Sequence, residues 1–109
     1  MKYEIINPSD KCYIYAEDVR LAKVACALLG GGWYGLKDEQ GEAVMNVFEA
    51  IDESIGVPVD QLKEFTNGHA AELAVVFRSF EYAGERTSLN HIGKKAESYA
   101  VAFERIAEQ

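Results

Sequence analysis

The hydrophobic period of the chain changes near its beginning, and this change limits the possible fold more than any other feature. Residues 2–6 (KYEII) and 11–16 (KCYIYA) alternate in the manner of strands that bury one face. The segment NPSD between them has the residue types of a tight turn, so an antiparallel hairpin is expected. From Asp18 to Leu29 the apolar residues instead cover most sides of a helix, with Glu17 and Asp18 suited to its first turn. Strands followed by helices predict an α+β fold.

Three consecutive glycines, Gly30 to Gly32, follow this predicted helix. A phosphate-binding glycine loop follows a strand and opens a helix, which is the reverse of the order found here. We therefore expect the glycines to end the helix, where a left-handed residue is commonly glycine. The chain then continues as a short strand, WYGLK, turns at DEQG and returns as EAVMN, which makes a second predicted hairpin. Residues 44–55 also fit a helix, so strand or helix stays open for residues 43–50.

The second half of the chain carries three helical patterns. A short helix is expected from Pro58 to the stop signal Asn67-Gly68, and a longer one over HAAELAVVFRSFEYA, broken by GERTS. The longer helix is expected to bury Leu73, Val76, Phe77 and Phe80. The last helix has a narrow seam, which suits packing along a neighbouring helix: Ile92, Ala96, Tyr99, Phe103 and Ile106. Together these patterns predict one α+β domain of 109 residues, with a small antiparallel sheet mainly in residues 2–45, one helix packed on it, and a helical C-terminal half.

Acidic residues are concentrated in the middle of the chain, whose formal net charge is −7. Residues 38–72 hold nine acids against Lys63 alone. Such a surface repels nucleic acid and membrane phosphate and attracts basic proteins, although a solvated face that only keeps the protein soluble has the same composition. Candidate partner-binding residues in or near this region are three acids and two aromatic residues: Glu49, Asp52, Glu53, Trp33 and Tyr34.

A second candidate surface is the more basic segment from Phe77 to Lys95. Its cationic and hydrogen-bonding residues could hold an anion or a carboxylate: Arg78, Arg86, Ser88, Asn90, His91, Lys94 and Lys95. Alternatively, Ser88 or Asn90 only caps the last helix. Gly93 lies in the first turn of that helix, where glycine is unfavourable, which indicates a close backbone approach.

The sequence holds no convincing catalytic or metal-binding pattern. Cys12 and Cys26 lie among apolar neighbours, which favours inert, reduced thiols over a nucleophile paired with His69 or His91. No metal-ligand spacing is present, and neither a cofactor nor a metal is expected. No apolar run reaches the length of a membrane span and no signal peptide is recognisable, so a cytoplasmic protein is expected.

Three segments together give a resemblance: NPSD after the first strand, LLGGGWYGL after the first helix, and RSFEYAGERTSLNHIGKKAESYA near the end. They resemble a family of small proteins encoded by bacteriophages and prophages. The resemblance implies a phage accessory protein in the cytoplasm of a bacterial host, and by association an inhibitor of host defence of the anti-CRISPR kind. It thus implies non-catalytic binding to a host factor, a CRISPR effector complex being the example. The acidic middle of the chain separately favours a protein or nucleoprotein partner with a basic surface. A homodimer, a nucleic-acid-binding regulator using the Arg78–Lys95 region, and an enzyme acting on a small anionic ligand stay open as alternatives.

Overall fold

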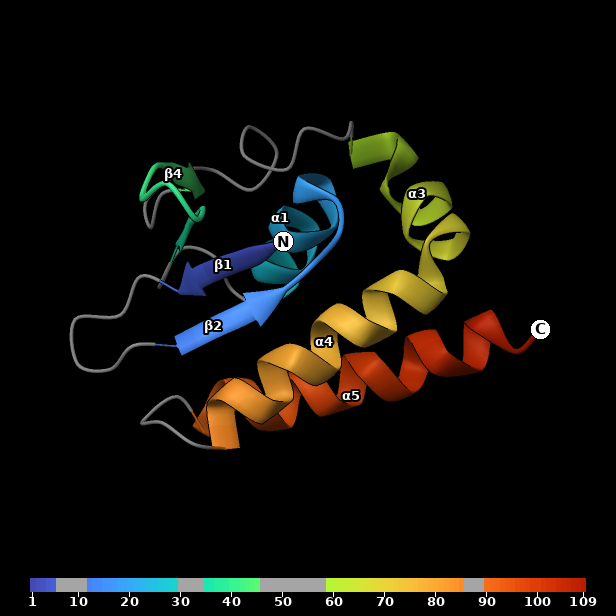
Figure 1. Ribbon diagram of the computed structural model, residues 1–109. Coiled ribbons are helices and arrows are strands. Elements are labelled where there is room, and N and C mark those ends of the chain that lie inside the picture. The colour runs from blue at the N-terminus through green and yellow to red at the C-terminus, as the bar shows by residue number, and fades with distance from the viewer. Residues whose placement is uncertain (6–11, 30–34, 46–58, 86–89) are drawn as a thin grey trace.

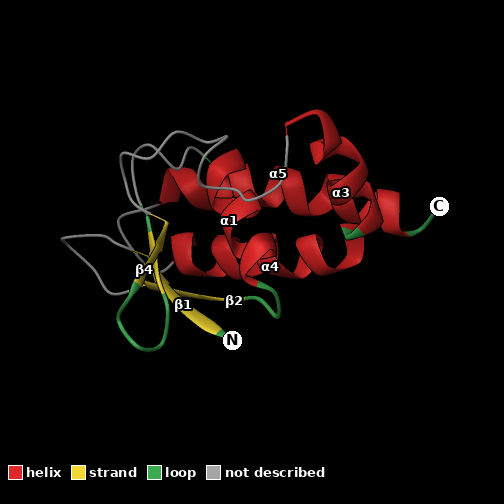
Figure 2. Ribbon diagram, turned by 90° about the horizontal axis from the view of Figure 1, so that it is seen from above, coloured by secondary structure: helices red, strands yellow, loops and turns green. Residues whose placement is uncertain are grey.

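In the computed structural model, the strands form a four-stranded antiparallel sheet in the order β2-β1-β3-β4 and the helices pack mainly on one side of it (Figures 1 and 2). The structure describes residues 1–5, 12–29, 35–45, 59–85 and 90–109. The strands are β1 (Lys2–Ile5), β2 (Cys12–Tyr15), β3 (Leu36–Lys37) and β4 (Ala43–Met45). The helices are α1 (Val19–Leu28), the 3-10 turn η1 (Val59–Gln61), α3 (Leu62–Gly68), α4 (Ala70–Glu85) and α5 (Asn90–Ala107). The predicted α+β fold is confirmed.

Both predicted hairpins are present. β1 pairs antiparallel with β2, and the predicted alternation is present: Cys12, Ile14 and the neighbouring Ala16 are buried, while Tyr13 and Tyr15 face solvent. β3 pairs antiparallel with β4, so residues 43–45 are strand. The helical alternative for the segment after them, and the turn NPSD, lie outside the described residues.

The turn between β3 and β4 is held by Asp38. Its Oδ1 accepts hydrogen bonds from the amides of Gln40 and Glu42 at 3.0 and 2.9 Å, and its carbonyl accepts one from the amide of Gly41 at 3.1 Å. Gly41 has a φ of +81°, the left-handed region that side chains with a Cβ rarely adopt. The predicted turn DEQG therefore depends on its aspartate for hydrogen bonds and on its glycine for the backbone angle.

α1 ends at Leu28, with Leu29 as its C-terminal cap, immediately before the expected glycines. Gly30 to Gly32 themselves lie outside the described residues. At the other end of α1, the sequence predicted Asp18 in the first turn, but the structure shows it as the N-cap. Its Oδ1 accepts a hydrogen bond from the amide of Arg20 at 2.8 Å, because a short polar side chain before a helix satisfies an amide that the helix leaves free.

The long helices differ from the sequence prediction mainly at their ends. α4 continues through Gly84 and Glu85, where GERTS was expected to break it, because Gly84 is buried against α5 and this packing offsets the low helix propensity of glycine. α5 already includes Asn90, so Asn90 is its first helical residue rather than a cap before it, and Ser88 lies outside the described residues.

The predicted seam of α5 faces the core. Ile92, Ala96 and Phe103 are buried, and Tyr99 and Ile106 pack against the core at its margin. A Cβ added to Gly93 would lie 3.4 Å from the carbonyl oxygen of Glu81 and 3.5 Å from Gly84, so Gly93 lets α5 approach the backbone of α4. The close backbone approach expected at Gly93 is therefore to another helix.

Replacing Gly41 by alanine is expected to lower the free energy of unfolding by about 1 kcal/mol, because alanine is strained at this φ although no atom lies within 4 Å of the added Cβ. Gly68→Ala is the matched control. That site is equally open and its φ is not positive, so alanine should raise stability by about 0.4–1 kcal/mol. Urea unfolding of both variants checks the pair, and equal stabilities would contradict the turn geometry.

Tyr3 gives a second test of the core, because its side chain is fully buried and its hydroxyl has no hydrogen-bond partner among the described residues. A buried polar group without a partner costs about 1–3 kcal/mol. Tyr3→Phe is therefore expected to leave stability unchanged or to raise it, whereas Tyr13→Phe, at an exposed site, should change it by less than about 0.5 kcal/mol. A clear loss of stability in urea unfolding of Tyr3→Phe would show that the hydroxyl has a partner.

Candidate partner-binding surface

Most residues of the two predicted surfaces lie outside the part of the chain that the structure describes. The residues that lie outside the described part of the chain are Trp33, Tyr34, Glu49, Asp52, Glu53, Arg86 and Ser88. Asn90 and His91 open α5, but their side chains are not described. The structure therefore places three of the predicted side chains: Arg78, Lys94 and Lys95.

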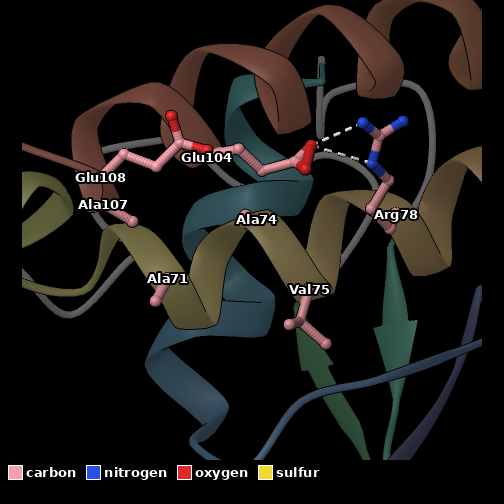
Figure 3. Close-up of a pocket in the computed structure, with 7 residues that line it drawn as sticks. All are labelled: Ala71, Ala74, Val75, Arg78, Glu104, Ala107 and Glu108. Atoms are coloured by element: carbon pink, nitrogen blue, oxygen red, sulfur yellow. Dashed lines mark hydrogen bonds and ion pairs between the residues drawn. The ribbon is translucent and has the colours of Figure 1, made fainter.

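Arg78 is engaged within the protein. Its Nη1 donates to Glu81 Oε1 at 2.9 Å, and its Nε donates to Glu104 Oε1 at 3.0 Å with a second bond from Nη2 (Figure 3). The hydrogen bonds that the guanidinium donates to Glu81 and then to Glu104 raise its pKa above the usual value. With two carboxylates beside it, Arg78 links α4 to α5 and offers little charge to an outside anion.

Lys94 and Lys95 are exposed on α5 and lie apart from Arg78. They precede Glu104, the partner of Arg78, by nine or ten residues, which corresponds to about 15 Å along the helix axis at 1.5 Å per residue. Arg78 and the two lysines therefore do not form one basic cluster.

A different surface gathers the large apolar side chains that the described chain exposes. We call it the β2–α4 face and define it by Met1, Tyr13, Tyr15, Val75 and Tyr82, which are 62, 38, 60, 65 and 59% exposed. β2 supplies Tyr13 and Tyr15, Met1 precedes β1, and α4 supplies Val75 and Tyr82. Met1, Tyr15 and Val75 line one hollow together, and exposed apolar side chains grouped in this way are typical of interaction sites.

The two parts of this face are joined through Ser79. The amide of Tyr15 donates to Ser79 Oγ at 3.1 Å, which ties the edge strand β2 to α4. Val75, Ser79 and Tyr82 are four and three residues apart and therefore lie on the same side of the helix. Beside them, Lys2 Nζ lies 4.7 Å from the ring centre of Tyr13, over the outer face of the sheet.

Val75 stands between two hollows. The first, of about 370 Å³, lies between α4 and the end of α5 and has a floor of alanines with Arg78 and Glu104 at its side (Figure 3). The second, of about 280 Å³, lies where β2, α1 and α4 meet. Because both hollows include Val75, they extend the β2–α4 face on either side of it.

Sequence reasoning missed the contribution of α4 to this face. Val75 and Tyr82 are seven residues apart, so a second apolar stripe could have been found in HAAELAVVFRSFEYA. The stronger stripe of Leu73, Val76, Phe77 and Phe80 conceals it. The alternation in KCYIYA predicts that Tyr13 and Tyr15 share one side of their strand, and the structure shows that this side is exposed.

The described thiols and imidazole are poorly placed for chemistry. Cys12 and Cys26 are buried, and burial raises the pKa of Cys26 to about 12, which keeps its thiol protonated. His69 Nδ1 lies 2.8 Å from the carbonyl oxygen of Phe65, at the end of its own helix. Across the described ranges, no three histidine, cysteine or acidic side chains gather so as to hold a metal ion. None of the helices described there has the length and apolar character to cross a membrane.

Comparisons of the chain with protein-family models, with curated proteins and with solved structures give no significant match.

The buried thiol of Cys26 predicts a loss of stability in alkali. In the unfolded chain a thiol ionises near pH 8.5–9, whereas in the folded protein its pKa is about 12. Unfolding between these values releases a proton, so the free energy of unfolding should fall by about 1.4 kcal/mol per pH unit from this group as the pH rises above 9. Urea unfolding between pH 8 and 10 of the protein and of Cys26→Ala measures this fall.

The alanine variant should be less stable at pH 8 but should lack the contribution of Cys26 to the slope. If the free energy of unfolding fell equally with pH in the two proteins, the burial of a protonated thiol would be contradicted.

Proposed function

We propose that this protein is a non-catalytic binding protein whose β2–α4 face docks onto a partner protein. The observation that carries the proposal is the gathering of exposed apolar side chains on one strand, one helix face and Met1. Tyrosine is enriched at protein interfaces, because its ring buries a large apolar area while its hydroxyl still forms hydrogen bonds. Three of the five residues that define the face are tyrosines.

The charges around this face favour a basic partner. Glu17 and Glu72 line one of the two hollows, and Glu108 lines the other beside the ion pair of Arg78 with Glu104. The chain as a whole carries −7. Complementary charge at the rim of an interface speeds association and excludes partners with the wrong sign, while the apolar centre supplies most of the affinity.

The resemblance to phage-encoded proteins supports a bacterial host factor as the partner, such as a CRISPR effector complex, met in the host cytoplasm. Lys94 and Lys95 favour the second candidate, a regulator that binds nucleic acid through the start of α5, because both side chains are exposed. The net charge opposes this second candidate, since affinity for nucleic acid depends on neutralising phosphates.

The proposal is tested by quantitative affinity capture from a bacterial lysate with tagged variants. Tyr15→Ser combined with Val75→Ser should reduce the captured partner about tenfold or more, because the loss of two central contacts costs at least about 1.4 kcal/mol. Both residues are exposed, so the melting temperature should change little.

The control combines Lys94→Ser with Lys95→Ser, which changes two exposed residues outside the face. It should retain the captured protein. If the lysine variant instead loses its partner while the face variant keeps it, the β2–α4 face is not the interface, and nucleic acid in the eluate would support the regulator.

A further inference from the structure

The hollow where β2, α1 and α4 meet has an apolar floor and an acidic rim. Leu21 and Val76 are buried and form part of its floor, and Tyr15 and Val75 are exposed and form its sides. Glu17 and Glu72 lie at its rim, both exposed. Glu17 belongs to the link between β2 and α1, and Glu72 to the first turn of α4, so the two carboxylates come from separate elements.

The size of this hollow fits one long side chain. Pockets for drug-sized molecules occupy about 300–1,000 Å³ and bury most of the ligand. This hollow measures about 280 Å³. A hollow at the lower end of this range is large enough to take one long side chain of a partner protein.

Several acids of the described chain are bound by arginine side chains, whereas in that part of the chain these two are not. Asp18 is bound by Arg20, and Glu81 and Glu104 are bound by Arg78. Among the described residues neither Glu17 nor Glu72 forms an ion pair. Met1 also lines the hollow, and its ammonium group donates to the carbonyl oxygen of Ala16 at 2.9 Å.

We propose that this hollow receives a lysine or arginine side chain of the partner protein. The apolar stem of such a side chain packs on Leu21 and Val76, and its cationic group reaches the two carboxylates at the rim. The ring of Tyr15 offers a further contact to a cation. The inference rests on the proposed function and names the chemistry that the β2–α4 face recognises at this end.

The test uses defined probes in place of the partner. N-acetylarginine methylamide and its uncharged counterpart, N-acetylcitrulline methylamide, are titrated into the labelled protein, and methyl resonances are followed by NMR. The arginine probe should shift the methyl signals of Leu21, Val75 and Val76, with an initial slope at least threefold steeper than that of the citrulline probe. N-acetyllysine methylamide should behave like the arginine probe.

Variants then locate the cation. Glu17→Gln and Glu72→Gln should each reduce the slope for the arginine probe about two- to fivefold, the range expected for one exposed ion pair. Glu97→Gln, which neutralises an exposed acid of α5 away from the hollow, should leave the slope unchanged. Equal slopes for arginine and citrulline, or equal effects of all three variants, would overturn the inference.

Failure of the inference and failure of the proposed function give different results. If Glu17→Gln combined with Glu72→Gln still captures the partner fully while Tyr15→Ser with Val75→Ser does not, the face is the interface but the hollow binds no essential cation. If neither pair affects capture, the proposed function itself is wrong.

Discussion

The stacking of Phe77 against α5 is the contact on which the rest of this structure depends. Its ring is fully buried, with its centre 5.0 Å from that of Tyr99 and 5.7 Å from that of Phe103. This packing joins the two longest helices, whose mutual contact is the most extensive between any two elements in the described chain. Because α4 also contacts β2 and α1, fixing its rotation about its own axis decides which side chains it turns outward. Val75 and Tyr82 are exposed beside the sheet as a result.

The sequence was sufficient to predict most of the fold, because the fold follows from periodic burial. Buried Cys12 and Ile14 alternate with exposed tyrosines, and the apolar residues of α5 repeat at the spacing of a packed helix. The buried side of each element can therefore be predicted from the spacing of its apolar residues. The candidate surface was harder to predict. The ion pair of Arg78 with Glu104 joins residues 26 apart, and no local pattern indicates such a partner. A helix that is apolar on several sides likewise does not reveal which stripe the tertiary structure leaves exposed.

Some acidic residues of the described chain are bound by its own arginines, and others are available to a partner. Arginines of the same chain bind the carboxylates of Asp18, Glu81 and Glu104. Glu17 and Glu72 instead lie at the rim of an apolar hollow. A high content of acidic residues is therefore a poor guide to function by itself, because a carboxylate that is bound by an arginine of the same chain attracts a basic partner only weakly. The relevant acids are those beside exposed apolar groups, where binding excludes water and strengthens the attraction.

The hydrogen bond from the amide of Tyr15 to Ser79 Oγ also helps to cover one edge of the sheet. β2 is an edge strand, and edge strands with free backbone groups can recruit strands from other molecules. Here α4 lies along that edge and its serine takes up one of the amides (Figure 1). A local opening that separated α4 from the sheet would expose this edge of β2, so the protection of the edge against strand addition depends on a helix rather than on the sheet itself.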